Sequence, residues 1–171
     1  INLSKFLIDK NRLGEAEENL KAALNANSSN VTSYLLLSSL YITKESYDNA
    51  EIYAKQGYEK FPDNEDIQIQ YSNSLIYSKK CEEARDIIIN QILKNNSTNY
   101  RANLQLSRIF FLQDKDLTKS EDLLNIIIRS YEEAAAKADK ESPIEDTILD
   151  GVGVIDEANI LLSKILFKRN K

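Results

Sequence analysis

Histidine is absent from this 171-residue chain, and cysteine occurs only once, as Cys81. The missing imidazole removes the commonest general base and metal ligand. A single thiol excludes an internal disulfide and a cysteine-based metal site. Catalysis would therefore have to use carboxylates, lysines or tyrosines alone. We expect a protein that is not an enzyme, with no catalytic residue, no cofactor and no metal ion.

Long apolar runs and an excess of basic residues are also missing. Apolar runs such as 35–37 and 87–89 fall far short of the roughly 18 residues that a membrane span needs. The net charge of −5 argues against a nucleic-acid partner, because phosphate neutralisation needs a basic face. The basic tail Lys168, Arg169 and Lys171 is typical of helix-dipole compensation. We expect neither nucleic-acid binding nor membrane insertion by this segment.

Methionine is absent too, so the chain carries no initiator residue, and no secretory signal precedes it. We therefore expect a segment cut from a longer protein, with more chain upstream of Ile1. The cellular compartment stays open: the cytoplasm is favoured slightly, and an exported or envelope-anchored location is the alternative.

Small residues, by contrast, recur along the chain every 34 positions. Only small side chains let two helices approach closely at a shared contact. Two small positions that repeat in phase at this period therefore indicate stacked helical hairpins. The alanines are Ala16, Ala50 and Ala84, and the serines upstream of them are Ser4, Ser38 and Ser72.

One repeat unit is especially regular. With the alanine as position 20, the unit that begins at Val31 resembles the tetratricopeptide repeat at nearly every signature position. The resemblance implies an all-α fold, a right-handed α-solenoid of stacked antiparallel helix hairpins with a concave surface lined by first helices. The matching residues are Tyr34, Leu37, Ser38, Tyr41, Ala50, Ala54, Gly57 and Pro62, with Tyr34 and Ser38 as mild departures.

The same alignment divides the whole chain. We expect a truncated first repeat at 1–30, complete repeats at 31–64 and 65–98, and a slipped fourth repeat at 99–132. The fourth repeat is out of register with the 34-residue period: Ser107 follows Ser72 by 35 positions, and Ser120 follows Ala84 by 36. The turn at 113–119 is predicted to hold the extra residue, since loops tolerate insertions.

Residues 133–171 are expected to form a helix extension and then a closing element of one of two kinds. The strong helix formers at 132–141 predict that the second helix of the fourth repeat is extended. An apolar stripe from Ile144 to Ile165 is typical of one long capping helix. Gly151 and Gly153 argue against such a helix, at roughly 1 kcal/mol each. We favour a degenerate fifth hairpin that turns at 150–153.

Partner-binding residues are expected on the first helices. Repeat positions 2, 5, 9 and 12 share one helix face, where apolar side chains alternate with polar or basic ones. Such a face is suited to an extended or helical peptide, although part of its apolar character is also explained by packing between helices. The candidates are Lys5, Leu35, Ser39, Ile69, Gln70, Asn73, Tyr77, Arg101, Leu104, Arg108 and Phe111.

The resemblance also allows one class of partner, chaperone C-terminal tails, to be checked residue by residue. Members that bind chaperone C-terminal tails use a clamp of lysine, asparagine and arginine at first-helix positions 2, 5, 6 and 9. The matching residues here are Ile1, Lys5, Leu36, Asp66 and Gln70, so we do not expect chaperone tails as partners.

The sequence therefore predicts a non-catalytic scaffold or adaptor that binds a protein or peptide in the concave groove. Two alternatives stay open: a structural module of a larger, possibly cell-envelope assembly, and the regulatory part of a larger enzyme. Cys81 lies at a position that is usually in the core, which favours an inert thiol over a reactive one.

Overall fold

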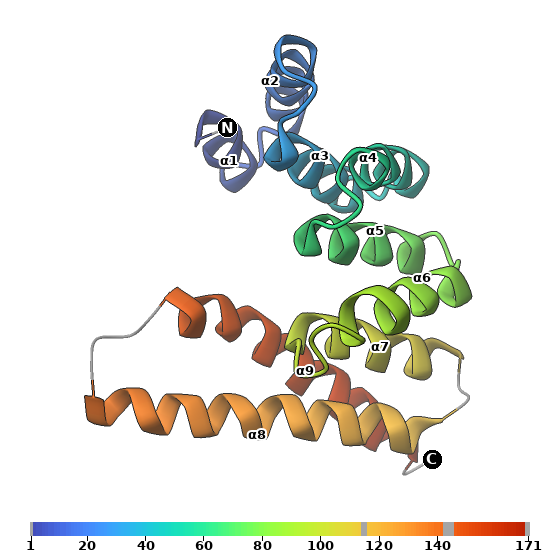
Figure 1. Cartoon of the computed structure of the whole chain (residues 1–171), viewed down its shortest axis with the longest axis vertical. Helices are drawn as coiled ribbons and strands as arrows, with labels where there is room; N and C mark the ends of the chain where they lie inside the picture. The colour runs from blue at the N-terminus through green and yellow to red at the C-terminus, as the bar shows by residue number, and fades with distance from the viewer. Residues whose placement is uncertain (1, 114–115, 142–145, 170–171) are drawn as a thin grey trace. The chain divides into compact units, whose positions relative to one another are not determined.

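A computed structural model describes residues 2–113, 116–141 and 146–169, with side chains described for 2–113, 116–133 and 153–169. Every regular element within these ranges is a helix (Figure 1), so the predicted all-α fold is confirmed. The chain divides into two compact units, residues 1–92 and 93–171.

The N-terminal unit is a row of helical hairpins. Within it α1 pairs with α2, α3 with α4, and α5 with α6, while α2 contacts α3 and α4 contacts α5. Each hairpin therefore buries its second face against the next one, as repeat proteins require. The helices are α1 Asn2–Asp9, α2 Leu13–Ala26, α3 Val31–Thr43, α4 Tyr47–Lys60, α5 Glu65–Tyr77 and α6 Cys81–Ile87, continued by the π-helical turn η1, Ile88–Leu93.

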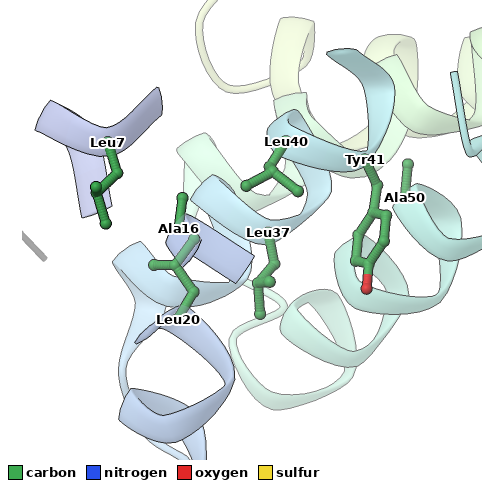
Figure 2. Packing of buried hydrophobic residues seen from close by; sticks show 7 residues of the cluster. All are labelled: Leu7, Ala16, Leu20, Leu37, Leu40, Tyr41 and Ala50. Carbon is green, nitrogen blue, oxygen red and sulfur yellow. The ribbon is translucent and has the colours of Figure 1, made fainter. Parts of the chain in front are cut away.

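The repeating alanines and serines lie where the helices touch. Ala16, Ala50 and Ala84 are fully buried, and the serines of the same repeats are at most 2% exposed. Figure 2 shows Ala16 and Leu20 of α2 beside Leu37 of α3, in a core cluster that also contains Leu7, Leu40, Tyr41 and Ala50. The small-residue contacts inferred from the period are confirmed.

The turn inside each of these hairpins has one recurring geometry. Asn11, Glu45 and Lys79 have φ of 57°, 56° and 64°, and they are spaced by the repeat period. The next backbone N–H donates to the carbonyl five residues back at 2.8 Å in all three turns. This is the Schellman ending, which normally uses glycine because a side chain is strained at positive φ. The sequence offered no glycine to mark these turns.

An asparagine caps the first helix of each later hairpin. Asn30, Asn64 and Asn99 each accept, through Oδ1, a hydrogen bond from the backbone N–H three residues on, at 3.1, 3.0 and 2.9 Å. Such caps contribute about 1 kcal/mol each. The first two caps are separated by the repeat period, and the last two by one position more. The π-helical turn η1 lies in the longer interval, and its wider i→i+5 ring takes up an extra residue.

In the described residues of the C-terminal unit the helices are α7 Tyr100–Gln113, α8 Leu117–Glu141 and α9 Asp146–Arg169. α7 and α8 form the next hairpin, and α9 contacts both. Ser120 replaces the repeating alanine, and its buried Oγ donates to the Ser107 carbonyl at 2.8 Å. The core is formed by Leu104, Leu124, Ile127, Ala158, Leu161 and Ile165. The predicted extension of the second helix is present, since α8 runs to Glu141.

The favoured fifth hairpin is wrong. α9 is one continuous helix from Asp146 to Arg169 and includes Gly153. Packing on α7 and α8 buries Ala158, Leu161 and Ile165, and that burial outweighs the cost of glycine in a helix. The alternative interpretation, a single long helix, describes this segment.

Candidate partner-binding surface

Apart from Lys5 on α1, the candidate residues of the N-terminal unit lie on α3 and α5, two helices in contact. Ser39 and Tyr77 are exposed there, and Leu35 is half-buried. We call the accessible residues of this face the α3–α5 surface: Thr32, Leu35, Ser39, Ile42, Asp66, Gln70, Asn73 and Tyr77.

Two predicted lining residues are not accessible. Ile69 is 3% exposed, and Leu104 is 4% exposed in the core of the C-terminal unit. Ile76, at position 12 of the same face, is 6% exposed. The +3 and +4 spacing that selects one helix face also selects side chains buried between adjacent helices. We therefore correct the prediction: Ile69 and Leu104 stabilise the packing and do not line a surface.

The polar candidates on α5 are partly engaged in the fold. The Gln70 side-chain amide donates to Ser38 Oγ at 2.9 Å, so it links α5 to α3. Asn73 is half-buried on the same face. Tyr77 is 37% exposed, and its ring stacks on Tyr47 of α4 at 5.4 Å and 19°. This stacking holds the Tyr77 ring in place while part of the side chain stays exposed to solvent.

The α3–α5 surface is almost free of charge. Among its eight residues, all within the described part of the chain, Asp66 is the only carboxylate, and no lysine or arginine is present. Lys5, the candidate from the first repeat, is exposed on α1. The surface therefore offers apolar contact and uncharged hydrogen-bonding groups rather than an ion-pairing site.

The candidates of the C-terminal unit lie on α7. Arg108 Nη2 is 2.8 Å from Glu157 Oε2 of α9, an ion pair that joins the two helices. Phe111 is half-buried, and Lys168 Nζ lies 5.5 Å from the centre of its ring. Arg101 is half-buried.

A network centred on Glu17 was missed from the sequence. Its carboxylate accepts from the Tyr41 hydroxyl and from Lys21 at 2.7 Å each, and from Lys44 at 2.5 Å. These hydrogen bonds, those of the two lysines first, lower the pKa of Glu17 to about 2. The network ties α2 to α3 of the next hairpin.

A sequence signal for this network existed. A glutamate follows the repeating alanine twice, as Glu17 and Glu51, which are spaced by the repeat period. Glu51 likewise reaches forward by one hairpin, to Lys80 at 2.5 Å. An acidic residue at this position therefore bridges neighbouring repeats, which indicates a structural role and not a catalytic one.

Cys81 opens α6 and is half-buried, and burial raises the pKa of its thiol. Among the residues that the structure describes, no group of three or more cysteine or acidic side chains is arranged to hold a metal ion. In that same part of the chain, no helix combines the length and the apolar character needed to cross a membrane.

Comparison with solved structures identifies the fold. A crystal structure of MamA aligns over 99% of this chain and 96% of the MamA chain, with a TM-score of 0.62 and 16% sequence identity. The crystal structure of YrrB is described as a TPR protein with an unusual peptide-binding site. It aligns over 100% of this chain and 90% of the YrrB chain, with a TM-score of 0.60 and 17% identity. No protein-family model and no curated protein sequence matches. The chain therefore has a tetratricopeptide-repeat fold.

Proposed function

We propose that this protein is a non-catalytic scaffold that binds a segment of a partner protein on the α3–α5 surface. The observation that carries the proposal is the composition of that surface: exposed Ser39 and Tyr77 beside half-buried Leu35, with almost no charge. Accessible apolar groups with a few directional polar ones are typical of peptide-binding faces. The peptide-binding site described for YrrB, a protein of the same fold, supports this use of the surface.

The chemistry of the surface selects the partner. A neutral peptide with small or apolar side chains matches Leu35 and Ile42, and its backbone can bond to Ser39 and Asn73. An acidic tail finds no lysine or arginine on this surface with which to pair. The segment proposed to bind the α3–α5 surface is therefore uncharged, and chaperone C-terminal tails are not among the candidates.

α7 supplies a second, separate contact in this proposal. Glu157 of the Arg108 pair is 51% exposed, and such exposed pairs contribute about 0.2–1 kcal/mol. A partner carboxylate can therefore replace Glu157 at small cost. Replacing Arg108 with glutamine should weaken only those partners that carry an acidic side chain.

A selected peptide provides the test. A displayed library of uncharged peptides is panned against the protein, and the enriched peptide is titrated by fluorescence polarisation. We expect Ser39→Arg to weaken its binding at least tenfold, because a long cation then covers the surface. Gln56→Arg, the same change at an exposed position of α4, should leave the affinity unchanged. Failure to enrich any peptide, or equal affinity in both variants, would reject the proposal.

The alternative role, a structural module in a larger assembly, is favoured by a different observation. The first and last helices, α1 and α9, expose large apolar side chains, with Phe6 51% and Phe167 65% exposed. An assembly that uses these two helices would leave the α3–α5 surface empty.

A further inference from the structure

Two side-chain contacts hold one face of α9 beside one face of α7. Arg108 Nη2 of α7 is 2.8 Å from Glu157 Oε2 of α9, and Lys168 Nζ of α9 lies 5.5 Å from the centre of the Phe111 ring of α7. Both helices belong to the C-terminal unit and contact each other there. Other side chains on these two faces therefore lie near the same contacts.

Helix periodicity extends each face by basic residues. Arg101 precedes Arg108 by seven positions, and Lys164 follows Glu157 by seven. Seven residues span about two helical turns, so the two members of each pair share one side of their helix, roughly 10 Å apart. Lys168 follows Lys164 by one further turn on that side. We call these residues the α7–α9 surface: Arg101, Arg108, Glu157, Lys164 and Lys168.

The α7–α9 surface is cationic. Among its members, all in the described part of the chain, four are basic and Glu157 is the only carboxylate. Lys164 and Lys168 are exposed, and the side chains of Arg108 and Glu157 are 28% and 51% exposed. The whole chain carries a net charge of −5, so its composition does not account for this local excess of positive charge. By charge complementarity the surface matches a segment rich in carboxylates.

Glu157 occupies the place that a carboxylate of such a segment would take. A guanidinium forms the same charge-assisted hydrogen bonds with a carboxylate of its own chain as with one of a partner. A partner's carboxylate must therefore displace Glu157 before it can pair with Arg108. An ion pair this exposed is weak, so the displacement should lower the affinity of the partner only about two- to fivefold.

We propose, building on the α7 contact of the proposed function, that the α7–α9 surface binds an acidic segment of a partner protein and that Glu157 is its internal competitor. Lys164 and Lys168 extend the site along α9, so several carboxylates in succession bind better than one. The competing polyanion would be a nucleic acid. It is disfavoured because the sequence pI is about 4.9, whereas nucleic-acid-binding domains are typically basic.

The affinity for a fluorescent oligoglutamate peptide, measured by fluorescence polarisation at low salt, tests the proposal. Glu157→Gln should bind this peptide about two- to fivefold more tightly than the wild type, because the internal competitor is removed. Asp156→Asn is the matched control. It removes the same charge from an exposed neighbour that lies about 100° around the helix, and it should bind like the wild type. Equal gains in both variants would mean that only net charge matters, which overturns the proposal.

A double-mutant cycle shows whether Glu157 acts through Arg108. Arg108→Gln should weaken binding severalfold, and adding Glu157→Gln to it should then give no gain. A gain of the same size in that background contradicts competition at Arg108. Lys164→Gln should also weaken binding, because it removes part of the cationic surface. Circular dichroism confirms that each variant is folded. If Glu157→Gln lowers the thermal midpoint but not the dissociation constant, the pair only joins α7 to α9 and the proposal fails.

Two further ligands separate the possible failures. An oligothymidine of equal length that binds more tightly than oligoglutamate would identify a nucleic-acid surface and overturn the proposal. The uncharged peptide selected for the α3–α5 surface should bind the wild type and Glu157→Gln equally. If that peptide binds but oligoglutamate binds neither protein, the acidic site is rejected while the α3–α5 surface stands. If oligoglutamate binds both proteins equally, the α7 contact stands and the competitor role of Glu157 is rejected.

Discussion

The close packing around Gly57 leads to a prediction opposite to the one that helix propensity alone would make. Gly57 is buried in α4, where α3 and α5 both approach. A Cβ added there would lie 2.9 Å from Ile67 Cδ1 and 3.1 Å from Tyr34 Cβ. We predict that Gly57→Ala lowers the free energy of unfolding, although alanine is the better helix former.

The magnitude follows from two opposing effects. Alanine in place of glycine inside a helix gains about 1 kcal/mol. Overpacking a well-filled core costs about 1–3 kcal/mol. Ile67 is 1% exposed, and Tyr34 Cβ is attached directly to the α3 backbone, so relieving the contact with Tyr34 requires the helices to move apart. We expect a net destabilisation of about 1 kcal/mol after the gain in propensity is subtracted.

Gly14 is the matched control in the same unit. It lies in the first turn of α2, and an added Cβ would meet nothing within 4 Å. Gly14→Ala should therefore stabilise the protein, by about 0.5–1 kcal/mol. Urea unfolding followed by circular dichroism measures both variants against the wild type. If Gly57→Ala proves as stable as Gly14→Ala, the close approach of the three helices is not real.

Three further changes test other parts of the structure. Gly153→Ala should raise stability by about 1 kcal/mol in thermal unfolding, because α9 is continuous and the site is open; a loss would indicate a turn there. Lys79→Gly should raise the free energy of unfolding by about 0.5–1 kcal/mol, because Lys79 has a φ of 64°, which strains a side chain. An unchanged midpoint of urea unfolding would argue against this positive φ. Glu17→Gln should lower the free energy of unfolding by about 1–2 kcal/mol relative to the wild type at pH 7, after allowance for solvent screening. The folded pKa of Glu17, about 2, lies below the ordinary 4.5, so this difference should be complete above pH 4.5 and vanish as the pH falls towards 2. A difference that stays constant across acid titration of both proteins would mean that the carboxylate charge is not involved.

Part of the candidate surface was predictable from the sequence, and part was not. Ser39 and Tyr77 are exposed as their repeat positions suggest, whereas Ile69 is buried. All three were chosen by helix periodicity, which places a residue on a face but does not say which neighbour covers that face. The ion pair of Arg108 was not predictable for the same reason, because its partner Glu157 lies 49 residues later on a helix whose position the sequence does not reveal.

The turns and the closing helix show a related limit. Glu45 and Lys79 adopt positive φ without being glycine, because the Schellman hydrogen bonds and the stacked hairpins hold them there. Conversely, Gly153 suggested a turn but lies inside α9. Local propensities amount to about 1 kcal/mol per residue, and tertiary burial exceeds them readily.

The sequence by itself determined the repeat. The small residues Ala16, Ala50 and Ala84 recur every 34 positions and are all fully buried, because no larger side chain fits where the hairpins touch. Only the tertiary structure decided which apolar side chains remain uncovered. Leu3 and Leu37 occupy the same repeat position, yet one is 57% exposed and the other fully buried. The physical reason is that burial depends on which helix packs against a residue, and a residue's own repeat does not specify that.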